Sequence, residues 1–382
     1  MVVIALLKKV VVGILVVYLS ITNTLAGHIE SFFAPVTEEE VVVEAETPPA
    51  TDMLVEVAHT AGTLAGAVPK VLLEHAEYQR AAVLASTQDE DMPTSIGDVP
   101  LEKAIEDALV NIYCQYKTDE YIRTTTGTGF FINQKGVILT NAHVAQFLLL
   151  KEAKGVTDDI ECVIRSGNPA TPKYVAELLY ISPTWVFENS EVIVEESPRG
   201  TGERDYALLY IAKSTDNSPL PAHFPALPID VALLSRATEG LEVFTAGYPA
   251  EELMRRGAEA ELHPVLAPTQ VGTLYTFGSN YADLFSISES PVGEHGASGG
   301  PIVNVWNQSA IGLIVTKGDA TTEGETSLRA LTLSYLDRTI QEETGFSLAQ
   351  NMQGDIAYRG LIFNKAMAPF LSEILMDELQ GE

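Results

Sequence analysis

The chain is poor in cysteine and in basic residues, and each shortage excludes a class of protein. Its two cysteines, Cys114 and Cys162, are too few among 382 residues for a disulfide scaffold or for a zinc site built from cysteines. They form either one bridge, if the chain is exported, or a pair of buried thiols. Lysine and arginine number 23 against 52 acidic residues, a formal net charge of −29. We therefore expect no nucleic-acid partner, because phosphate contacts need a basic surface.

Long hydrophobic runs are scarce as well. The run at residues 10–19 is shorter than the roughly 20 residues that a membrane span needs, although extending it to residue 26 brings it close. Lys8 and Lys9 precede the run and small residues end it at Ala26, which is typical of a signal peptide. We expect residues 1–26 to be a signal peptide or an uncleaved membrane anchor, with a buried strand as the alternative. A signal peptide or an anchor predicts an extracytoplasmic protein, secreted or membrane-anchored.

Residues 27–100 are strongly acidic, with 14 acidic residues and two basic ones. The glutamates at 38–40 and the prolines at 48–49 predict a solvated linker or stalk. A helix is expected to start at Pro100, capped by Asp98, because apolar residues then recur at helical spacing.

After residue 109 the pattern changes to short segments rich in Val, Ile and aromatic residues, separated by turn signals. Such a run of short strands predicts an all-β fold, a sandwich or a pair of barrels, with little helix. A terminal helix is expected at 334–343 and a helical stretch near 365–379. The expected strands cover residues 110–116, 121–126, 128–132, 137–140, 162–165, 174–181, 191–196, 206–211, 242–246, 272–277, 284–288, 301–305, 311–316 and 329–333.

Ser298 stands in the sequence Gly-Ala-Ser-Gly-Gly-Pro at residues 296–301. Glycine adopts backbone angles that other residues avoid and lets another chain approach closely. Both properties are needed where a serine hydroxyl attacks a carbonyl while backbone N–H groups hold the developing oxyanion. A surface turn is the alternative interpretation.

A serine hydroxyl needs a base, and histidine is the usual one. Of the seven histidines, His143 differs because it directly follows the strand expected at 137–140 and opens a short apolar helical turn. Asp205 precedes the apolar strand expected at 206–211 and could orient the imidazole. Judged alone, the first could be a structural histidine and the second a turn residue. Their joint presence with Ser298 predicts a catalytic triad.

Three blocks, residues 140–143, 205–209 and 296–301, resemble the motifs of chymotrypsin/trypsin-like serine proteases of the PA clan, and the bacterial Deg-type branch is most similar in style. Residues 127–132 and 246–249 are similar to two further motifs of this family. The resemblance implies two six-stranded β-barrels with the site in the cleft between them. It implies a protease domain at 101–345 and a C-terminal tail at 346–382, too short for the PDZ domain that often follows in Deg-type enzymes.

The resemblance also implies residue roles. Ser298 would be the nucleophile, His143 the general base and then acid, and Asp205 the orienting carboxylate. The N–H groups of Gly296 and Ser298 would form the oxyanion hole. Ala297 replaces the Asp of many trypsin-like enzymes, so activation by a freed N-terminus is not expected. The residues expected to contact substrate are Val292 at the base of the pocket, His295 on the same turn, and the strand residues Ile314, Val315 and Thr316.

The implied function is an exported serine endopeptidase that hydrolyses polypeptides through an acyl-enzyme intermediate and uses no cofactor or metal. The alternative is a catalytically silent binding protein on the same fold. An α/β-hydrolase esterase is disfavoured, because that fold places the histidine last in chain order. The sequence does not define the oligomeric state, and the N-terminal segment is a candidate membrane tether.

Overall fold

The computed structural model describes residues 92–117, 122–152, 160–195, 201–250, 261–287, 292, 296–317 and 328–380. All of these fall within one unit, Val68–Glu382. The signal peptide or anchor expected at residues 1–26 and most of the expected acidic linker lie outside the described residues. Within the described residues, no helix combines the length and the apolar character that crossing a membrane requires.

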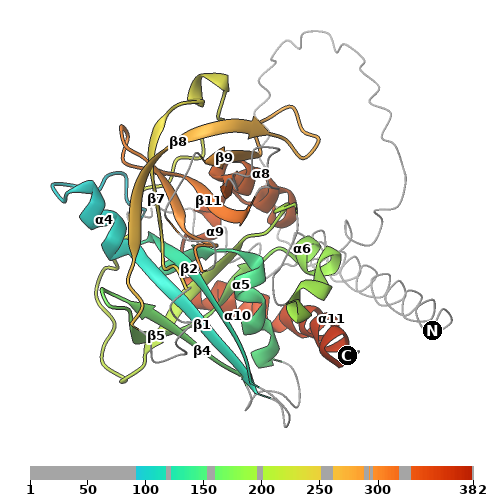
Figure 1. Cartoon of the computed structure of the whole chain (residues 1–382). Helices are drawn as coiled ribbons and strands as arrows, with labels where there is room; N and C mark the ends of the chain where they lie inside the picture. The colour runs from blue at the N-terminus through green and yellow to red at the C-terminus, as the bar shows by residue number, and fades with distance from the viewer. Residues whose placement is uncertain are drawn as a thin grey trace, which may run out of the picture. The chain divides into compact units, whose positions relative to one another are not determined.

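The described strands close into two antiparallel β-barrels of six strands each (Figure 1). The first barrel has the strand order β1-β2-β3-β6-β5-β4, and the second has the order β10-β11-β12-β9-β8-β7. The expected all-β fold of two six-stranded barrels is thereby confirmed. The strands are β1 Leu109–Lys117, β2 Ile122–Asn133, β3 Val137–Thr140, β4 Ile160–Ser166, β5 Thr171–Ile181, β6 Ala207–Ser214, β7 Glu242–Gly247, β8 Val265–Tyr275, β9 Leu284–Ile287, β10 Pro301–Asn304, β11 Ala310–Lys317 and β12 Leu328–Thr332.

Helices are more numerous than the sequence indicated, and most of them follow the second barrel in the chain. The α-helices are α4 Leu101–Ala108, α5 Ala142–Leu149, α6 Pro183–Glu188, α8 Leu333–Thr344, α9 Leu348–Asn351, α10 Ile356–Ala366 and α11 Ala368–Gln380. Short 3-10 helices are η1 Leu150–Glu152, η2 Ser190–Val194 and η3 Arg236–Thr238. The expected helices at 334–343 and near 365–379 correspond to α8 and α11.

Four local expectations differ from the structure. The strand expected at 272–277 is β8, which begins at Val265 and ends at Tyr275. The segments 121–126 and 128–132 form one strand, β2, because the intervening glycine does not interrupt its pairing with β1. The strand expected at 191–196 is the 3-10 helix η2, in which Val192 and Ile193 are both buried although an alternating strand would expose one of them. Helix α4 has Pro100 rather than Asp98 at its N-cap, with no side-chain cap.

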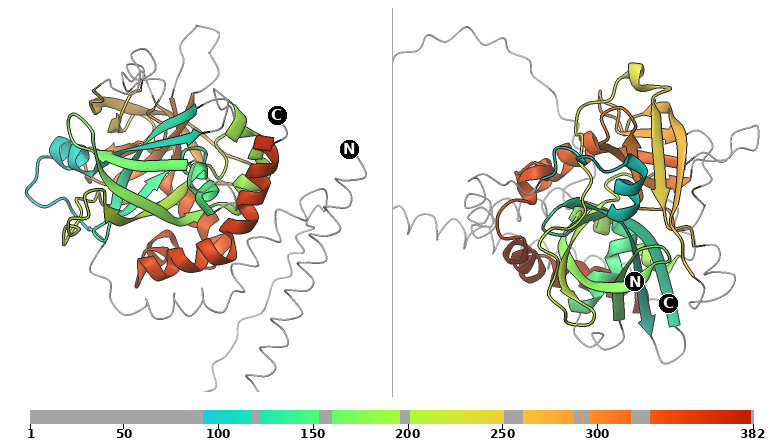
Figure 2. Two further views of the ribbon diagram at one scale, coloured as in Figure 1. Left: turned by 90° about the horizontal axis from the view of Figure 1, so that it is seen from below. Right: turned by 90° about the vertical axis from the view of Figure 1, so that its left-hand side faces the viewer.

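The C-terminal helices pack against the first barrel although they follow the second one in sequence. Helix α10 packs on β5 and β6, and α11 packs on α5, α6 and η2. Figure 2 shows both helices along one side of the first barrel. Phe363, Leu371 and Leu375 are fully buried there and join the core of that barrel. The helical tail that the sequence predicted is thus part of the packed structure.

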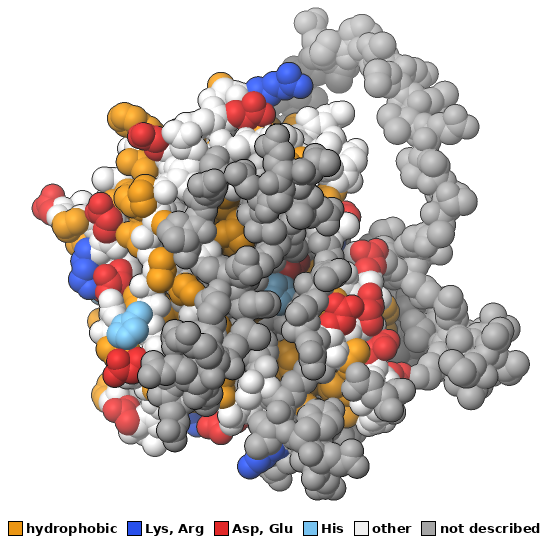
Figure 3. Space-filling view, in the orientation of Figure 1, with side chains coloured by type: hydrophobic (Ala, Val, Ile, Leu, Met, Phe, Trp, Pro, Cys, Tyr) orange, Lys and Arg blue, Asp and Glu red, His pale blue; other side chains and the backbone are white. Residues whose placement is uncertain are grey.

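Cys114 and Cys162 face each other on β1 and β4 and form a disulfide, with their Cα atoms 4.0 Å apart. Of the two states that the sequence allowed, the bridge is the one found. It joins the pair of strands that closes the first barrel. On the face seen in Figure 3, acidic side chains are spread over the surface with few basic ones among them.

The packing of α10 can be tested at Gly360. A Cβ atom at this position would clash with the Tyr210 ring and lie 3.2 Å from the carbonyl oxygen of Leu178. Alanine is normally more favourable than glycine in a helix by about 1 kcal/mol. We nevertheless expect Gly360→Ala to lower the free energy of unfolding by about 1–3 kcal/mol, because overpacking outweighs helix propensity here. Urea denaturation measures the change, and a stabilised variant would contradict the close approach.

Candidate active site

The first half of the site lies at the adjoining ends of β3 and β6. His143 is the second residue of α5, which starts directly after β3, and Asp205 lies two residues before β6. Strands β3 and β6 are paired, with Thr140 opposite Ala207, so the two loops that carry these side chains lie side by side. The order strand, histidine and helix, which the sequence predicted, is the one found.

Asp205 holds His143 at two points. The Nδ1 atom of His143 lies 2.7 Å from Oδ2 of Asp205, and the backbone N–H of His143 donates to Oδ1 over 3.0 Å. Asn141 fixes the aspartate in turn, since its side-chain amide donates to the Asp205 carbonyl over 2.9 Å. Asp205 is 4% exposed, so water competes little for its carboxylate. With Nδ1 engaged, Nε2 is the ring nitrogen that remains for proton transfer.

Ser298 lies in the second barrel, in the turn before β10. The backbone of Gly299 has φ +88°, and a Cβ atom there would overlap the Thr128 carbonyl oxygen and the Thr140 hydroxyl. Gly296 is also left-handed, with φ +84°. The glycines therefore let the serine turn press against the first barrel, as the sequence predicted.

Thr128 on β2 connects this turn to the first barrel. Its backbone N–H donates to the Ser298 carbonyl over 2.8 Å, and its hydroxyl donates to the Gly296 carbonyl over 2.6 Å. The same hydroxyl accepts from the Tyr248 N–H over 2.9 Å. The Thr128 carbonyl accepts from the hydroxyl of Thr140, at the end of β3 next to the His143 loop, over 2.7 Å. These bonds bring the serine turn to the edge of the first barrel that carries His143 and Asp205.

Thr128 is a site residue that the sequence analysis did not single out. The available signal was its position between Gly127 and Gly129, in the segment 127–132 that resembles a motif of the protease family. A buried hydroxyl that both donates and accepts across two barrels cannot be recognised before the barrels are placed.

The residues expected to contact substrate differ in where the structure places them. Val292 is 1% exposed and belongs to the apolar cluster of the second barrel. Ile314 does not present its backbone to a substrate, because its N–H donates to the Gly300 carbonyl and its carbonyl accepts from the Gly299 N–H. Val315 lies at a shift in the register between β11 and β12. His295 lies outside the described residues, and so does the side chain of Thr316.

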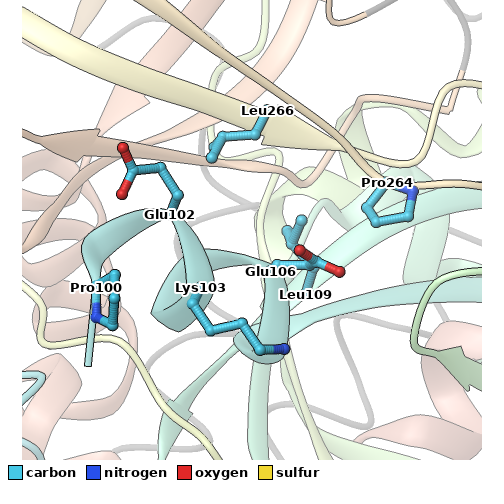
Figure 4. A pocket seen from close by; sticks show the side chains of 7 residues that line it. All are labelled: Pro100, Glu102, Lys103, Glu106, Leu109, Pro264 and Leu266. Carbon is cyan, nitrogen blue, oxygen red and sulfur yellow. The ribbon is translucent and has the colours of Figure 1, made fainter.

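One pocket of the described part of the chain lies elsewhere. It has a volume of about 300 Å³ and lies between α4 and the start of β8 (Figure 4). None of His143, Asp205 and Ser298 lines it. The described residues also contain no group of three His, Cys, Asp or Glu side chains that could hold a metal ion.

Comparison with known proteins identifies one family. Residues 127–313, from β2 to β11, match the trypsin-like peptidase domain, and this range contains His143, Asp205 and Ser298. No curated protein matches the chain. A solved structure, the active form of the Rv3671c protease from M. tuberculosis, is similar over 68% of this chain and 93% of that one, with 18% identity and a TM-score of 0.38.

Thr128→Val tests the link between the barrels. Valine keeps nearly the same shape but removes the hydroxyl, so the Tyr248 N–H and the Gly296 carbonyl lose a buried partner. We expect the free energy of unfolding to fall by about 1–3 kcal/mol, as measured by urea denaturation. Thr128→Ser keeps the hydroxyl and is the control. If both variants were equally stable, the hydroxyl would not hold the turn.

Proposed function

Because this chain belongs to the chymotrypsin/trypsin-like proteases, we propose that it is a serine endopeptidase with Ser298, His143 and Asp205 as its catalytic triad. The observation that carries the proposal is the contact of His143 with the buried Asp205 carboxylate, 2.7 Å between Nδ1 and Oδ2. The bonds of Thr128 to the Ser298 turn support the placement of the serine beside this pair.

In the proposed reaction the Ser298 hydroxyl oxygen attacks the carbonyl carbon of the scissile peptide bond. Nε2 of His143 takes the hydroxyl proton, and Asp205 stabilises the resulting imidazolium. The tetrahedral intermediate collapses as His143 gives the proton to the leaving amine, which leaves an ester on Ser298. Water, deprotonated by the same imidazole, hydrolyses this ester and releases the acid product.

The oxyanion would be held by the N–H groups of Gly296 and Ser298. Among the described residues, no carbonyl accepts a hydrogen bond from either group. The Gly296 carbonyl is engaged by the Thr128 hydroxyl, so the orientation of this turn is set before substrate arrives. A donor that is already oriented needs no reorganisation as charge develops in the transition state.

Substrate would lie along β11 as an added strand, with its backbone paired to the protein. Pairing would begin at Val315 rather than Ile314, since the backbone groups of Ile314 are used within the protein. Bulges of this kind are common next to active sites, where they end regular pairing. An apolar residue at Val292 supports a pocket that favours apolar or small side chains, with His295 on the same turn.

We propose further that the protein works outside the cytoplasm. The bridge between Cys114 and Cys162 supports this, because disulfides persist in oxidising compartments. The signal-peptide pattern at residues 1–26 supports it independently. Residues 27–100 would then link the protease domain at 101–345 to the exported N-terminus or to a membrane tether.

The nucleophile can be tested with a fluorophosphonate probe and a casein substrate. We expect the wild-type protein to hydrolyse casein and to carry the probe on Ser298. Ser298→Ala should lose both, and His143→Ala should lower the labelling rate by at least about 10³-fold, because the hydroxyl is no longer activated. Circular dichroism checks folding, and Ser218→Ala, in an exposed loop, is the control. A folded wild-type protein that neither cleaves nor labels would be the silent binding protein.

Export can be tested by fractionating cells that express the full chain or a version lacking residues 1–26. We expect the full chain outside the cytoplasm, with no titratable thiol after unfolding. The truncated protein should remain soluble in the cytoplasm. Partitioning of the truncated protein into membranes would point to an anchor elsewhere, and a cytoplasmic full chain would contradict export.

A further inference from the structure

Arg204 directly precedes Asp205 and adopts a left-handed backbone, with φ +55°. L-residues other than glycine rarely take this conformation, because Cβ comes close to a backbone oxygen. Such backbone persists only where the surroundings enforce it, and it is frequent at functional sites. The conformation of Arg204 determines the direction in which the chain enters Asp205.

Helix α8 holds this residue together with the local turn, in which the Asp205 N–H donates to the Gly202 carbonyl over 3.2 Å. The guanidinium of Arg204 donates from Nη1 to Glu343 over 2.8 Å and from Nη2 to Glu342 over 3.0 Å. The backbone N–H of Arg204 donates to the hydroxyl of Tyr335, at the start of the same helix, over 3.2 Å. Helix α8 thus holds both the side chain and the backbone of the left-handed residue.

The same helix also holds the residue on the other side of Asp205. The hydroxyl of Tyr206 donates to the Thr339 hydroxyl over 2.8 Å, and that hydroxyl donates onward to the Tyr335 carbonyl. Burial raises the pKa of the Tyr206 and Tyr335 hydroxyls, so both stay neutral. The two neighbours of the aspartate are therefore bound to successive turns of one helix.

Glu343 is the buried residue at the centre of these contacts. It is 1% exposed, and its carboxyl accepts hydrogen bonds from Tyr180, from Ser182 over 2.9 Å and from Arg204. Burial raises the pKa of this carboxyl well above its usual range. A buried carboxyl with all its donors in place fixes the geometry of its partners closely.

Helix α8 is anchored in the second barrel as well. It follows β12 directly, and the guanidinium of Arg338 contacts the Asp283 carboxylate. Asp283 is fully buried and also accepts from Thr276, Phe277 and Ser279 in the turn between β8 and β9. The helix that holds Arg204 is therefore fixed to the barrel that carries Ser298.

We propose that helix α8 is a clamp that sets the position of Asp205, with Arg204 and Glu343 as positioning residues. The proposal rests on the triad proposed above. Because Asp205 holds both the ring and the backbone N–H of His143, a displaced aspartate moves the imidazole relative to the serine. The clamp joins the barrel that carries His143 and Asp205 to the barrel that carries Ser298. It therefore sets the position of the two barrels relative to each other.

The test compares Arg204→Ala with Arg204→Gly. Both variants lose the guanidinium, but glycine adopts the left-handed backbone without the Cβ penalty. We expect Arg204→Ala to lower kcat and the fluorophosphonate labelling rate of Ser298 by about 10- to 100-fold, with KM changed by less than about threefold. Arg204→Gly should regain most of that loss although it restores no contact. A merely structural ion pair would not distinguish the two variants in this way.

Two controls separate positioning from stability. Gln308→Ala makes the same kind of change at another left-handed residue, φ +57°, in the exposed turn between β10 and β11, and should not slow labelling. Glu343→Gln keeps the shape of the buried side chain and weakens its hold on Arg204, so it should slow labelling by about 3- to 10-fold. If Arg204→Ala does not fold, the labelling rate of Glu343→Gln tests the clamp instead.

The outcomes are distinct. Wild-type labelling rates in a folded Arg204→Ala, or in Glu343→Gln if the alanine variant does not fold, would overturn the clamp and leave the triad intact. Equal losses in Arg204→Ala and Arg204→Gly would overturn the claim that the clamp acts through the left-handed backbone of Arg204, because that backbone would then not matter. A wild-type protein without labelling would refute the proposed function and the clamp with it.

Discussion

The contact between Asp205 and His143 is the constraint on which the rest of the site depends. A carboxylate that is 4% exposed needs partners that satisfy it, and the ring and backbone N–H of His143 supply two of them. Asn141 holds the aspartate from one side, and the neighbours Arg204 and Tyr206 hold it from the other. An imidazole fixed in this way presents one nitrogen in one direction, as a general base must.

Each barrel contributes one connection that holds the site together. Thr128 reaches from the first barrel to the turn that carries Ser298, while α8 reaches from the second barrel to the loop that carries Asp205. These are independent connections, one through a hydroxyl and one through the ion pair of Arg204 with the buried carboxyl of Glu343. Together they fix the relative position of the two halves of the site, which neither barrel completes alone. A site divided between two bodies in this way depends on the bonds between the bodies as much as on its reacting groups.

The sequence predicted the features that are local. Strand β3 matched in full, because three apolar residues between a turn and Thr140 form it, and His143 was correctly placed at the start of a helix. The strand predicted at 191–196 was wrong, because its β-branched residues pack as a 3-10 helix against α11. Arg204 carried no sequence signal, since a left-handed arginine depends on contacts with a helix that lies more than a hundred residues further along the chain. Thr128 lies in the segment 127–132 that resembles a motif of the protease family, but its role depends on where the second barrel lies.

The most direct test of the account is the rate at which a fluorophosphonate attaches to Ser298 in Asp205→Asn, with the adduct mapped by mass spectrometry. Asparagine keeps the shape of the side chain but loses the charge, and it can stabilise the wrong tautomer of the His143 imidazole. The account predicts a single adduct, on Ser298, that forms about 10⁴-fold more slowly than in the wild-type protein. An unchanged rate, or an adduct on another residue, would contradict it.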